Sequence, residues 1–326
     1  MNKKRSRMII PIFAALAVLL IFAPFLIPVN PLPGLKPYDQ VGEAGRTYLE
    51  VDGIRLHYVE EGRGDQVVIF LHGFGSHLYS WSTVMPVLGE NYRVVAYDRP
   101  GFGLSERPLV TGGDTENPYT LEEQVDQLVG MMDRLGIPQA VLVGNSAGAN
   151  VALQMALSHP QRVKALVFVD AAISLQSHRG WDFLWPLLWT PQADHLGVLL
   201  ARMLATRSEE FLHRAYADPL RISPEMRAYY ALPLQVEGWD RGLWEFTRAN
   251  RRHDLTGRLA GLALPVLVIS GDTDWIVPAA QSIRLAEAVP GAELAIMKDC
   301  GHAPQEECPQ EFLAAVEPFL SGLFSK

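Results

Sequence analysis

The chain has 326 residues, of which 48% are hydrophobic and 20% are charged, and its formal net charge is −8. A chain of this length and composition can bury a substantial core and suits one domain with an insertion. The acidic balance, with no basic run beyond the N-terminus, argues against nucleic acid as a partner.

The N-terminus joins a basic flank to a long uncharged segment. Lysines and arginines precede residues 8–27, which carry no charge. A helix rises about 1.5 Å per residue, so this segment would be about 30 Å long, enough to cross a bilayer. The basic flank should stay cytoplasmic. We therefore expect a single-pass membrane anchor over residues 1–30, a linker over 31–46, and the rest of the chain on the non-cytoplasmic side. A cleaved signal peptide, giving a secreted protein, is the alternative.

Short strand patterns follow. Residues 48–51 and 54–60 alternate in polarity around Asp52-Gly53, a pair typical of a tight hairpin turn. Further strand patterns alternate with helical ones and lie near residues 66–71, 92–97, 140–144, 165–169, 266–270 and 294–298. Such alternation predicts an α/β protein with a mostly parallel, eight-stranded sheet and helices on both faces.

One helix is delimited by signals at both of its ends. Thr120 precedes residues 121–135, and Glu123 stands three positions after it, which is the spacing of a capping box. Gly136 follows the last helical residue, where a left-handed residue commonly ends a helix. We therefore expect a helix over residues 121–135.

Ser146 is the strongest candidate for chemistry. It lies in Gly144-Asn145-Ser146-Ala147-Gly148, between the apolar run 140–143 and the helix-forming residues 147–158. A strand that turns sharply into a helix strains the backbone, which small neighbours make tolerable. The strain lifts the hydroxyl above the sheet, and the first helical amides point at an arriving oxygen. This placement predicts a nucleophile, and the alternative is a serine in a glycine-rich helix cap.

A base and an acid follow Ser146 in the chain. The apolar run 265–270 leads into a loop that holds Asp272 and Asp274, and a second run, 294–297, precedes His302. Loops after parallel strands gather at one edge of the sheet, so these side chains can meet although they are distant in sequence.

With these motifs, residues 47–322 resemble the α/β-hydrolase family. The resemblance implies that Ser146 is the nucleophile, that His302 is the base and that Asp274 is the acid. Asp170, which ends the strand pattern at 165–169, and Asp272 remain alternatives for the acid.

The resemblance also implies an oxyanion hole. The segment His72-Gly73-Phe74-Gly75 follows a buried strand, and the backbone N–H groups of Phe74 and Ala147 would hold the oxyanion. The segment Tyr97–Ser105, with the charged pair Asp98 and Arg99, is interpreted as architecture near the site rather than as chemistry.

A stretch without strand character separates Asp170 from Pro265. A structureless loop of that length is improbable in a compact domain. We therefore expect a helical cap over residues 173–255, inserted into a core made of residues 47–172 and 256–326.

Tryptophans recur every four residues in the first part of this cap, at Trp181, Trp185 and Trp189. A four-residue spacing would place them on one face of an α-helix. They would line an apolar substrate pocket, or they would pack the cap onto the core.

Two cysteines, Cys300 and Cys308, bracket His302. They would form a disulfide in an oxidising compartment or serve as small buried residues, and the sequence leaves both possibilities open. No Cys/His cluster has the spacing of a zinc site, and Gly73–Gly75 lacks a dinucleotide fingerprint. We therefore expect neither a metal nor a cofactor.

The sequence thus predicts a serine hydrolase that cleaves an apolar carboxylic ester through an acyl-enzyme on Ser146. The alternative is a carbon–carbon bond hydrolase, because Asn145 is similar to that branch of the family. That branch needs a cation for a substrate carboxylate, which Arg251 or Arg252 could supply. A catalytically silent, membrane-tethered binding protein is less favoured, because the triad is complete. A serine at position 146 also argues against epoxide-hydrolase chemistry, which uses an aspartate.

Overall fold

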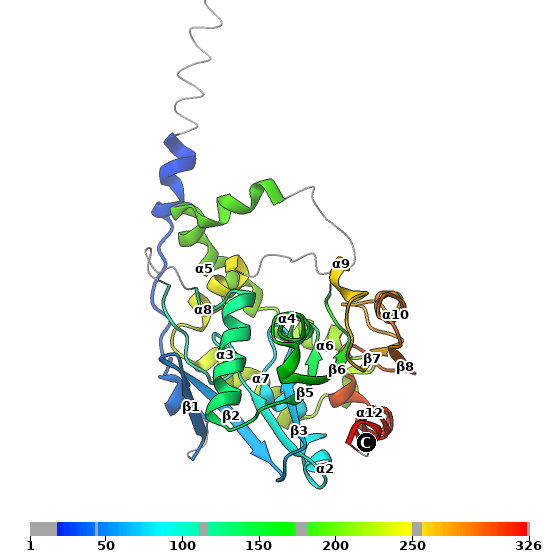
Figure 1. The fold of residues 1–326 in the computed structure, drawn as a ribbon. Coiled ribbons are helices and arrows are strands. Elements are labelled where there is room, and N and C mark those ends of the chain that lie inside the picture. Colours follow the sequence, from blue (N-terminus) through cyan, green and yellow to red (C-terminus); the bar gives the residue numbers. More distant parts are fainter. Residues whose placement is uncertain (1–17, 43–44, 111–116, 174–181, 250–255, 325–326) are drawn as a thin grey trace, which may run out of the picture.

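The computed structural model describes residues 18–42, 45–110, 117–173, 182–249 and 256–324 (Figure 1). One sheet contains eight strands in the order β1-β2-β4-β3-β5-β6-β7-β8. The strands are β1 (Thr47–Val51), β2 (Ile54–Glu61), β3 (Val67–Leu71), β4 (Arg93–Tyr97), β5 (Ala140–Asn145), β6 (Val163–Val169), β7 (Val266–Gly271) and β8 (Glu293–Met297).

The pairing directions confirm the predicted fold class. β1 pairs with β2, and β2 with β4, in antiparallel fashion, and all the other neighbours are parallel. The hairpin turns at Asp52, whose φ of 50° lies in the left-handed region that such a turn needs.

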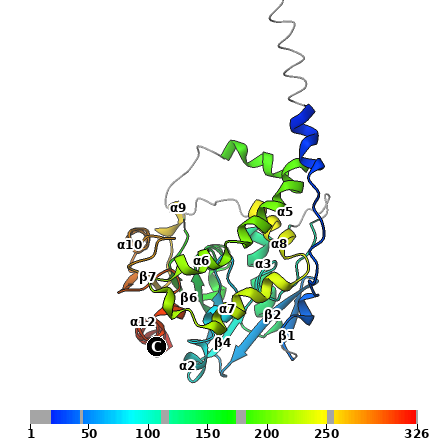
Figure 2. The same cartoon turned by 180° about the vertical axis from the view of Figure 1, so that it is seen from behind.

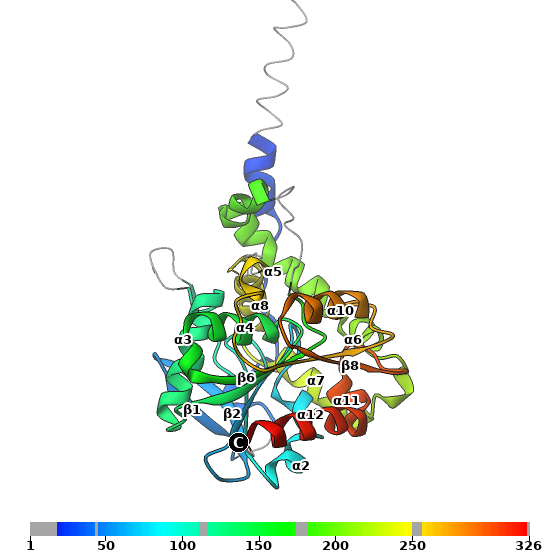
Figure 3. The same cartoon turned by 45° about the vertical axis from the view of Figure 1, so that its right-hand side comes forward.

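Helices cover both faces of the sheet (Figure 3). Strand β3 shows why, because Ile69 packs into one hydrophobic core and its neighbours Val68 and Phe70 pack into another. The helices of the first core are α3 (Leu121–Arg134), α4 (Gly148–Ser158), α9 (Thr256–Leu259) and α10 (Ala279–Ala288). Those of the second are η3 (Leu78–Trp81), α2 (Met85–Gly89) and α12 (Pro309–Phe324).

The predicted capping of α3 is present. The Thr120 hydroxyl accepts a hydrogen bond from the Glu123 amide at 3.3 Å. The helix ends before Gly136, whose φ is +66°. Local side-chain chemistry therefore sets both ends of this helix.

Between β6 and β7 the described residues form helices and no strand (Figure 2). We call residues 182–249 the cap helices. They are η5 (Asp182–Trp189), α5 (Pro191–Ala205), α6 (Ser208–Ala215), η6 (Pro219–Arg221), α7 (Pro224–Ala231), η7 (Leu232–Gln235) and α8 (Trp239–Ala249). Helices α5 and α8 pack closely because Gly197 has no side chain where the Trp244 indole lies. An ion pair joins them too, since the buried Arg248 binds the partly exposed Asp194 of α5 at 2.8 Å.

The N-terminal segment corrects one prediction. The described helix from residue 18 gives way to the 3₁₀ helix η1 (Ala23–Leu26), which contains Pro24. The Ile27 carbonyl then accepts a hydrogen bond from His195 of α5 at 2.8 Å. Within the described ranges, no helix combines the length and apolar character that a membrane span requires. The predicted single-pass membrane placement is therefore wrong, and residues 8–17 of the proposed span lie outside the described residues.

Candidate active site

Ser146 occupies a strained turn between β5 and α4. Its φ is 51°, an unusual value for a residue with a side chain. A Cβ atom on Gly144 would lie 2.7 Å from the backbone of Ala149, and one on Gly148 would collide with the carbonyl of Leu71. Both positions therefore need glycine, as the sequence motif implies, and the turn brings Ser146 to the start of α4.

His302 and Asp274 form a buried pair at the same edge of the sheet. Nδ1 of His302 lies 2.7 Å from Oδ2 of Asp274. The other carboxylate oxygen, Oδ1, accepts hydrogen bonds from the amides of Ile276 at 2.7 Å and Val277 at 3.0 Å. Because the carboxylate accepts the Nδ1 proton, the neutral ring presents Nε2 as a proton acceptor.

The two halves of the site are joined next to Ser146. Nδ2 of Asn145 donates to the carbonyl of His302 at 3.1 Å and to the carbonyl of Val169 at 3.2 Å. The Gly73 backbone closes in from the other side, because a Cβ there would lie 3.2 Å from Cβ of Ser146. Ser146, the His302 loop and the segment after β3 therefore meet in one place.

The two alternative acids differ from Asp274. Asp272 is exposed. Asp170 is fully buried, and its Oδ1 accepts from the Ser270 hydroxyl at 2.7 Å and the Gly271 amide at 3.1 Å. Burial, and then the charge of Asp274, raises the pKa of Asp170 well above its ordinary range. Asp170 therefore holds its proton more tightly than an exposed aspartate does.

Two side-chain sets in the described chain bring three potential metal-ligand atoms within 4.8 Å of one another: Asp170, Asp274 and His302, and Cys300, Glu307 and Cys308. In the first set, His302 Nδ1, both oxygens of Asp274 and Oδ1 of Asp170 make the hydrogen bonds given above, whereas Oδ2 of Asp170 has no partner among the described residues. In the second set the sulfurs are joined in a disulfide, with their Cα atoms 6.3 Å apart, so neither is a thiolate. The disulfide resolves the question that the sequence left open.

Arg99 holds the segment that follows β3. Its Nη2 donates to the carbonyls of His72 at 2.8 Å and Gly73 at 3.2 Å, and its amide donates to His72 Nε2 at 3.0 Å. Burial, and then the Arg99 charge, lowers the pKa of His72 to about 3, so that ring is neutral. The ring of Phe74 in this segment meets the Phe102 ring edge-on and lies tilted against the ring of Phe246 of α8. Arg99 is therefore a structural residue that fixes the backbone of His72 and Gly73, and Gly73 lies next to Ser146.

The cap tryptophans lie in a different geometry from the one expected. Trp181 lies outside the described residues, as do Arg251 and Arg252. Trp185 is half-buried, whereas Trp189 is exposed and stacks its ring under the guanidinium of Arg248, 4.6 Å from Cζ to the ring centroid. Because η5 is a 3₁₀ helix with three residues per turn, a four-residue spacing does not keep one face. Substrate binding by these tryptophans stays a prediction.

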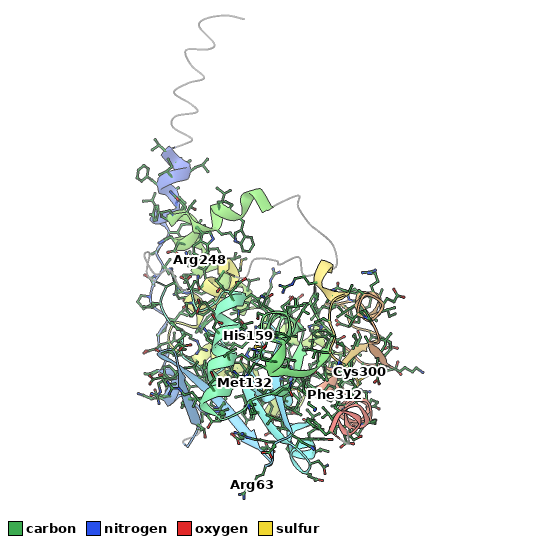
Figure 4. All side chains as sticks on the ribbon, in the orientation of Figure 1. Arg63, Met132, His159, Arg248, Cys300 and Phe312 are labelled. Atoms are coloured by element: carbon green, nitrogen blue, oxygen red, sulfur yellow. A yellow bond between two sulfur atoms is a disulfide. The ribbon has the colours of Figure 1, made fainter. Side chains whose placement is uncertain are left out.

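Sequence reasoning missed how the cap touches the His302 loop. The His302 amide donates to the carbonyl of Ala215, at the end of α6, with a distance of 2.6 Å. Two acidic residues of α11 (Pro304–Glu307) also reach the cap. Cys300 and Cys308 belong to the second core together with Phe312, and Figure 4 labels Cys300 and Phe312. A main-chain contact such as that between His302 and Ala215 cannot be predicted from the residue types, because every residue has these backbone atoms.

The chain is similar to known hydrolases. A family model described as alpha/beta hydrolase fold matches residues 66–309. The chain is 33% identical over 290 residues to 2-hydroxymuconate semialdehyde hydrolase from Pseudomonas sp. (strain CF600), covering 86% of this chain and 94% of that protein.

Two solved structures extend the comparison. The meta-cleavage product hydrolase from Pseudomonas fluorescens IP01 has a TM-score of 0.67 and 26% identity, over 86% of this chain and 98% of that one. The enol-lactonase from Burkholderia xenovorans LB400 has a TM-score of 0.68 and 25% identity, over 84% and 100%.

Proposed function

The chain belongs to the α/β-hydrolase family, and we propose that it is a serine hydrolase with Ser146 as nucleophile, His302 as base and Asp274 as the orienting acid. The observation that carries the proposal is the buried bond between His302 Nδ1 and Asp274 Oδ2, 2.7 Å long, which leaves Nε2 as the acceptor. Nε2 of His302 accepts the hydroxyl proton while Oγ of Ser146 attacks a carbonyl carbon.

The developing oxyanion needs donors that are in place before the reaction. The backbone N–H groups of Phe74 and Ala147 supply them in this proposal. When the intermediate collapses, the leaving group takes the proton from His302, and Asp274 stabilises the imidazolium until then. Water, deprotonated by His302, hydrolyses the acyl group on Ser146. Loss of one oxyanion donor typically costs about 2.7 to 4 kcal/mol of transition-state stabilisation.

Carbon–carbon bond hydrolysis is the substrate chemistry with the best support. The named relatives include hydrolases of 2-hydroxymuconate semialdehyde and of meta-cleavage products. An asparagine directly before the nucleophile, as at Asn145, is typical of that branch of the family. A carbon leaving group must delocalise the electron pair of the broken bond, so the substrate would be an aldehyde or ketone whose departing fragment is conjugated. Carbon–carbon bond hydrolysis is therefore placed before ester cleavage, whereas the sequence alone favours an ester substrate.

Ester cleavage is the second candidate, and the likeness to an enol-lactonase favours it. A lactone is an ester, and its leaving group is an oxygen that needs only a proton from His302. The same nucleophile and oxyanion hole serve both reactions. The difference lies in the leaving group, and so in the pocket that surrounds it.

Two substrates and one probe test the proposal. The full chain and Ser146→Ala would be assayed on 2-hydroxymuconate semialdehyde, followed by loss of its conjugated absorption, and on a short aryl ester. Faster turnover of the semialdehyde supports the carbon–carbon assignment, and turnover of the ester alone supports the second candidate. A fluorophosphonate probe would label the parent at Ser146 but not the variant. An unlabelled parent would contradict a serine hydrolase and favour the silent binding protein.

A further inference from the structure

The end of cap helix α6 lies directly on the His302 loop. The His302 amide donates to the Ala215 carbonyl at 2.6 Å. A Cβ atom on Gly301 would collide with this same carbonyl and would lie 2.8 Å from the Ala217 nitrogen. The backbones of the loop and the cap are therefore in contact, with no side chain between them at Gly301.

Glu307 bridges these two backbones. It is 5% exposed, and its Oε2 accepts from the amides of Gly301 at 2.7 Å and Ala217 at 3.0 Å. Its Oε1 accepts from the amide of Asp218 at 2.8 Å. One carboxylate thus satisfies one amide of the loop and two of the cap. An ionised carboxylate suits three donors because both of its oxygens only accept.

The disulfide restricts the His302 loop itself, so Glu307 is needed only to join that loop to the cap. Cys300 and Cys308, eight positions apart in sequence, close a covalent ring that contains both His302 and Glu307. The ring restricts the loop internally, but its bonds do not join the loop to the cap. Hydrogen bonds make that connection. They include those of the His302 amide, of Glu307 and of its neighbour Glu306, whose Oε2 accepts from the Tyr216 hydroxyl at 2.8 Å. Arg221 of the cap also donates to the Glu307 carbonyl at 3.3 Å.

We propose that Glu307 is a positioning residue that couples the cap to His302, so that the ring of His302 reaches its working position only when residues 215–218 are docked. The cap then contributes to catalysis as well as to substrate choice. This inference rests on the proposed function of His302 as the base.

The test compares three variants of the full chain. Glu307→Gln keeps the volume but turns one acceptor into a donor that faces backbone N–H groups. Glu307→Asp keeps the charge on a shorter stem, and Glu311→Gln, exposed on α12, is the matched control. A displacement of about 1 Å at a reacting group can cost about 100-fold in rate, so Glu307→Gln should lower kcat about 10- to 100-fold. KM should change less than about threefold, Glu307→Asp should recover part of the rate, and Glu311→Gln should match the parent.

A purely structural role gives a different result. If Glu307→Gln melts at a lower temperature but keeps the kcat and the pH profile of the parent, the proposal is overturned. A second readout is independent of the reaction. Hydrogen exchange of the His302 amide, which binds Ala215 and not Glu307, should be faster in Glu307→Gln than in the parent. Unchanged exchange there would refute the coupling even if no substrate were found, whereas absent labelling at Ser146 would refute only the proposed function.

Discussion

The side-chain amide of Asn145 binds the main-chain carbonyl of His302 across 3.1 Å. The residue before the candidate nucleophile therefore holds the loop that carries the candidate base. The same amide nitrogen binds Val169 on the neighbouring strand, so β5, β6 and the His302 loop share one donor group. A change at Asn145 should alter the relative placement of Ser146 and His302 without touching either.

We expect Asn145→Ala to lower both activity and stability. The change removes the donor of the His302 carbonyl, whereas the Val169 carbonyl keeps the Ser146 amide at 2.9 Å. An unsatisfied buried polar group costs about 1 to 3 kcal/mol. Asn150→Ala is the matched control, because Nδ2 of Asn150 also donates to a carbonyl, that of Ala172, at 3.3 Å. Urea unfolding and fluorophosphonate labelling would be measured on both. We expect both variants to lose a similar amount of stability, and only Asn145→Ala to lose labelling. Equal labelling of the two variants would refute the link between Asn145 and His302.

The two carboxyl groups beside His302 should respond differently to amide substitution. Asp274→Asn replaces the acceptor of Nδ1 with a group that favours the wrong tautomer, and a loss of about 10⁴-fold in kcat is the known scale of that effect. Burial and the Asp274 charge raise the pKa of Asp170 well above its ordinary range and so favour its uncharged form, which an asparagine resembles, so Asp170→Asn should retain most of the activity at pH 7. Steady-state rates of the two variants provide the measurement. An equally inactive Asp170→Asn would mean that the acid is assigned to the wrong residue.

Glu306 should make the protein less stable as pH rises. Burial raises its pKa from 4.5 to about 7, although hydroxyl donors on Tyr230 and Tyr216 act in the opposite direction. The folded state therefore holds the proton more tightly than the unfolded state. Its stabilising contribution is complete below pH 4.5 and is lost as pH rises to about 7.

The difference between the parent and Glu306→Gln isolates this effect. His72 and His77, whose pKa values burial lowers to about 3 and about 4, change stability with pH in the opposite sense, because their contribution is lost as pH falls below 6.5. They are common to both proteins and cancel in the difference. Denaturant unfolding from pH 4.5 to 8 should show a parent that loses stability relative to Glu306→Gln. A constant difference would contradict the assigned pKa.

The fold could be anticipated because its signals are local. The hairpin at Asp52-Gly53, the strand alternation and the capping of Thr120 all depend on residues close in sequence. The turn at Ser146 can also be predicted from local sequence, since Gly144 and Gly148 occupy positions where a side chain would collide with backbone atoms. The catalytic roles themselves stay predictions.

What could not be anticipated depends on distant backbone or on helix type. The contact of Ala215 with the His302 amide involves main-chain atoms, which any residue type possesses. The cysteine spacing does not supply the Cα separation that decides a disulfide. The tryptophan repeat suggested an α-helix, but residues 182–189 form a 3₁₀ helix with Pro186 inside it. Apolar composition at residues 8–27 could not show that the helix changes type at Ala23.

Gly144, two positions before the candidate nucleophile, should be sensitive to substitution. A Cβ atom on Gly144 would lie 2.7 Å from Cα and N of Ala149, in the first turn of α4, so that turn must shift in Gly144→Ala. Overpacking of this kind typically costs about 1 to 3 kcal/mol of unfolding free energy. Gly322→Ala, in α12, meets nothing within 4 Å and is the control. It should be neutral or slightly stabilising, because alanine favours a helix by about 0.5 to 1 kcal/mol over glycine. The rate of Ser146 labelling would be measured at a temperature where Gly144→Ala stays folded. Slower labelling than in the parent would show that the turn sets the reactivity of the hydroxyl, and labelling at the rate of the parent would show that it does not.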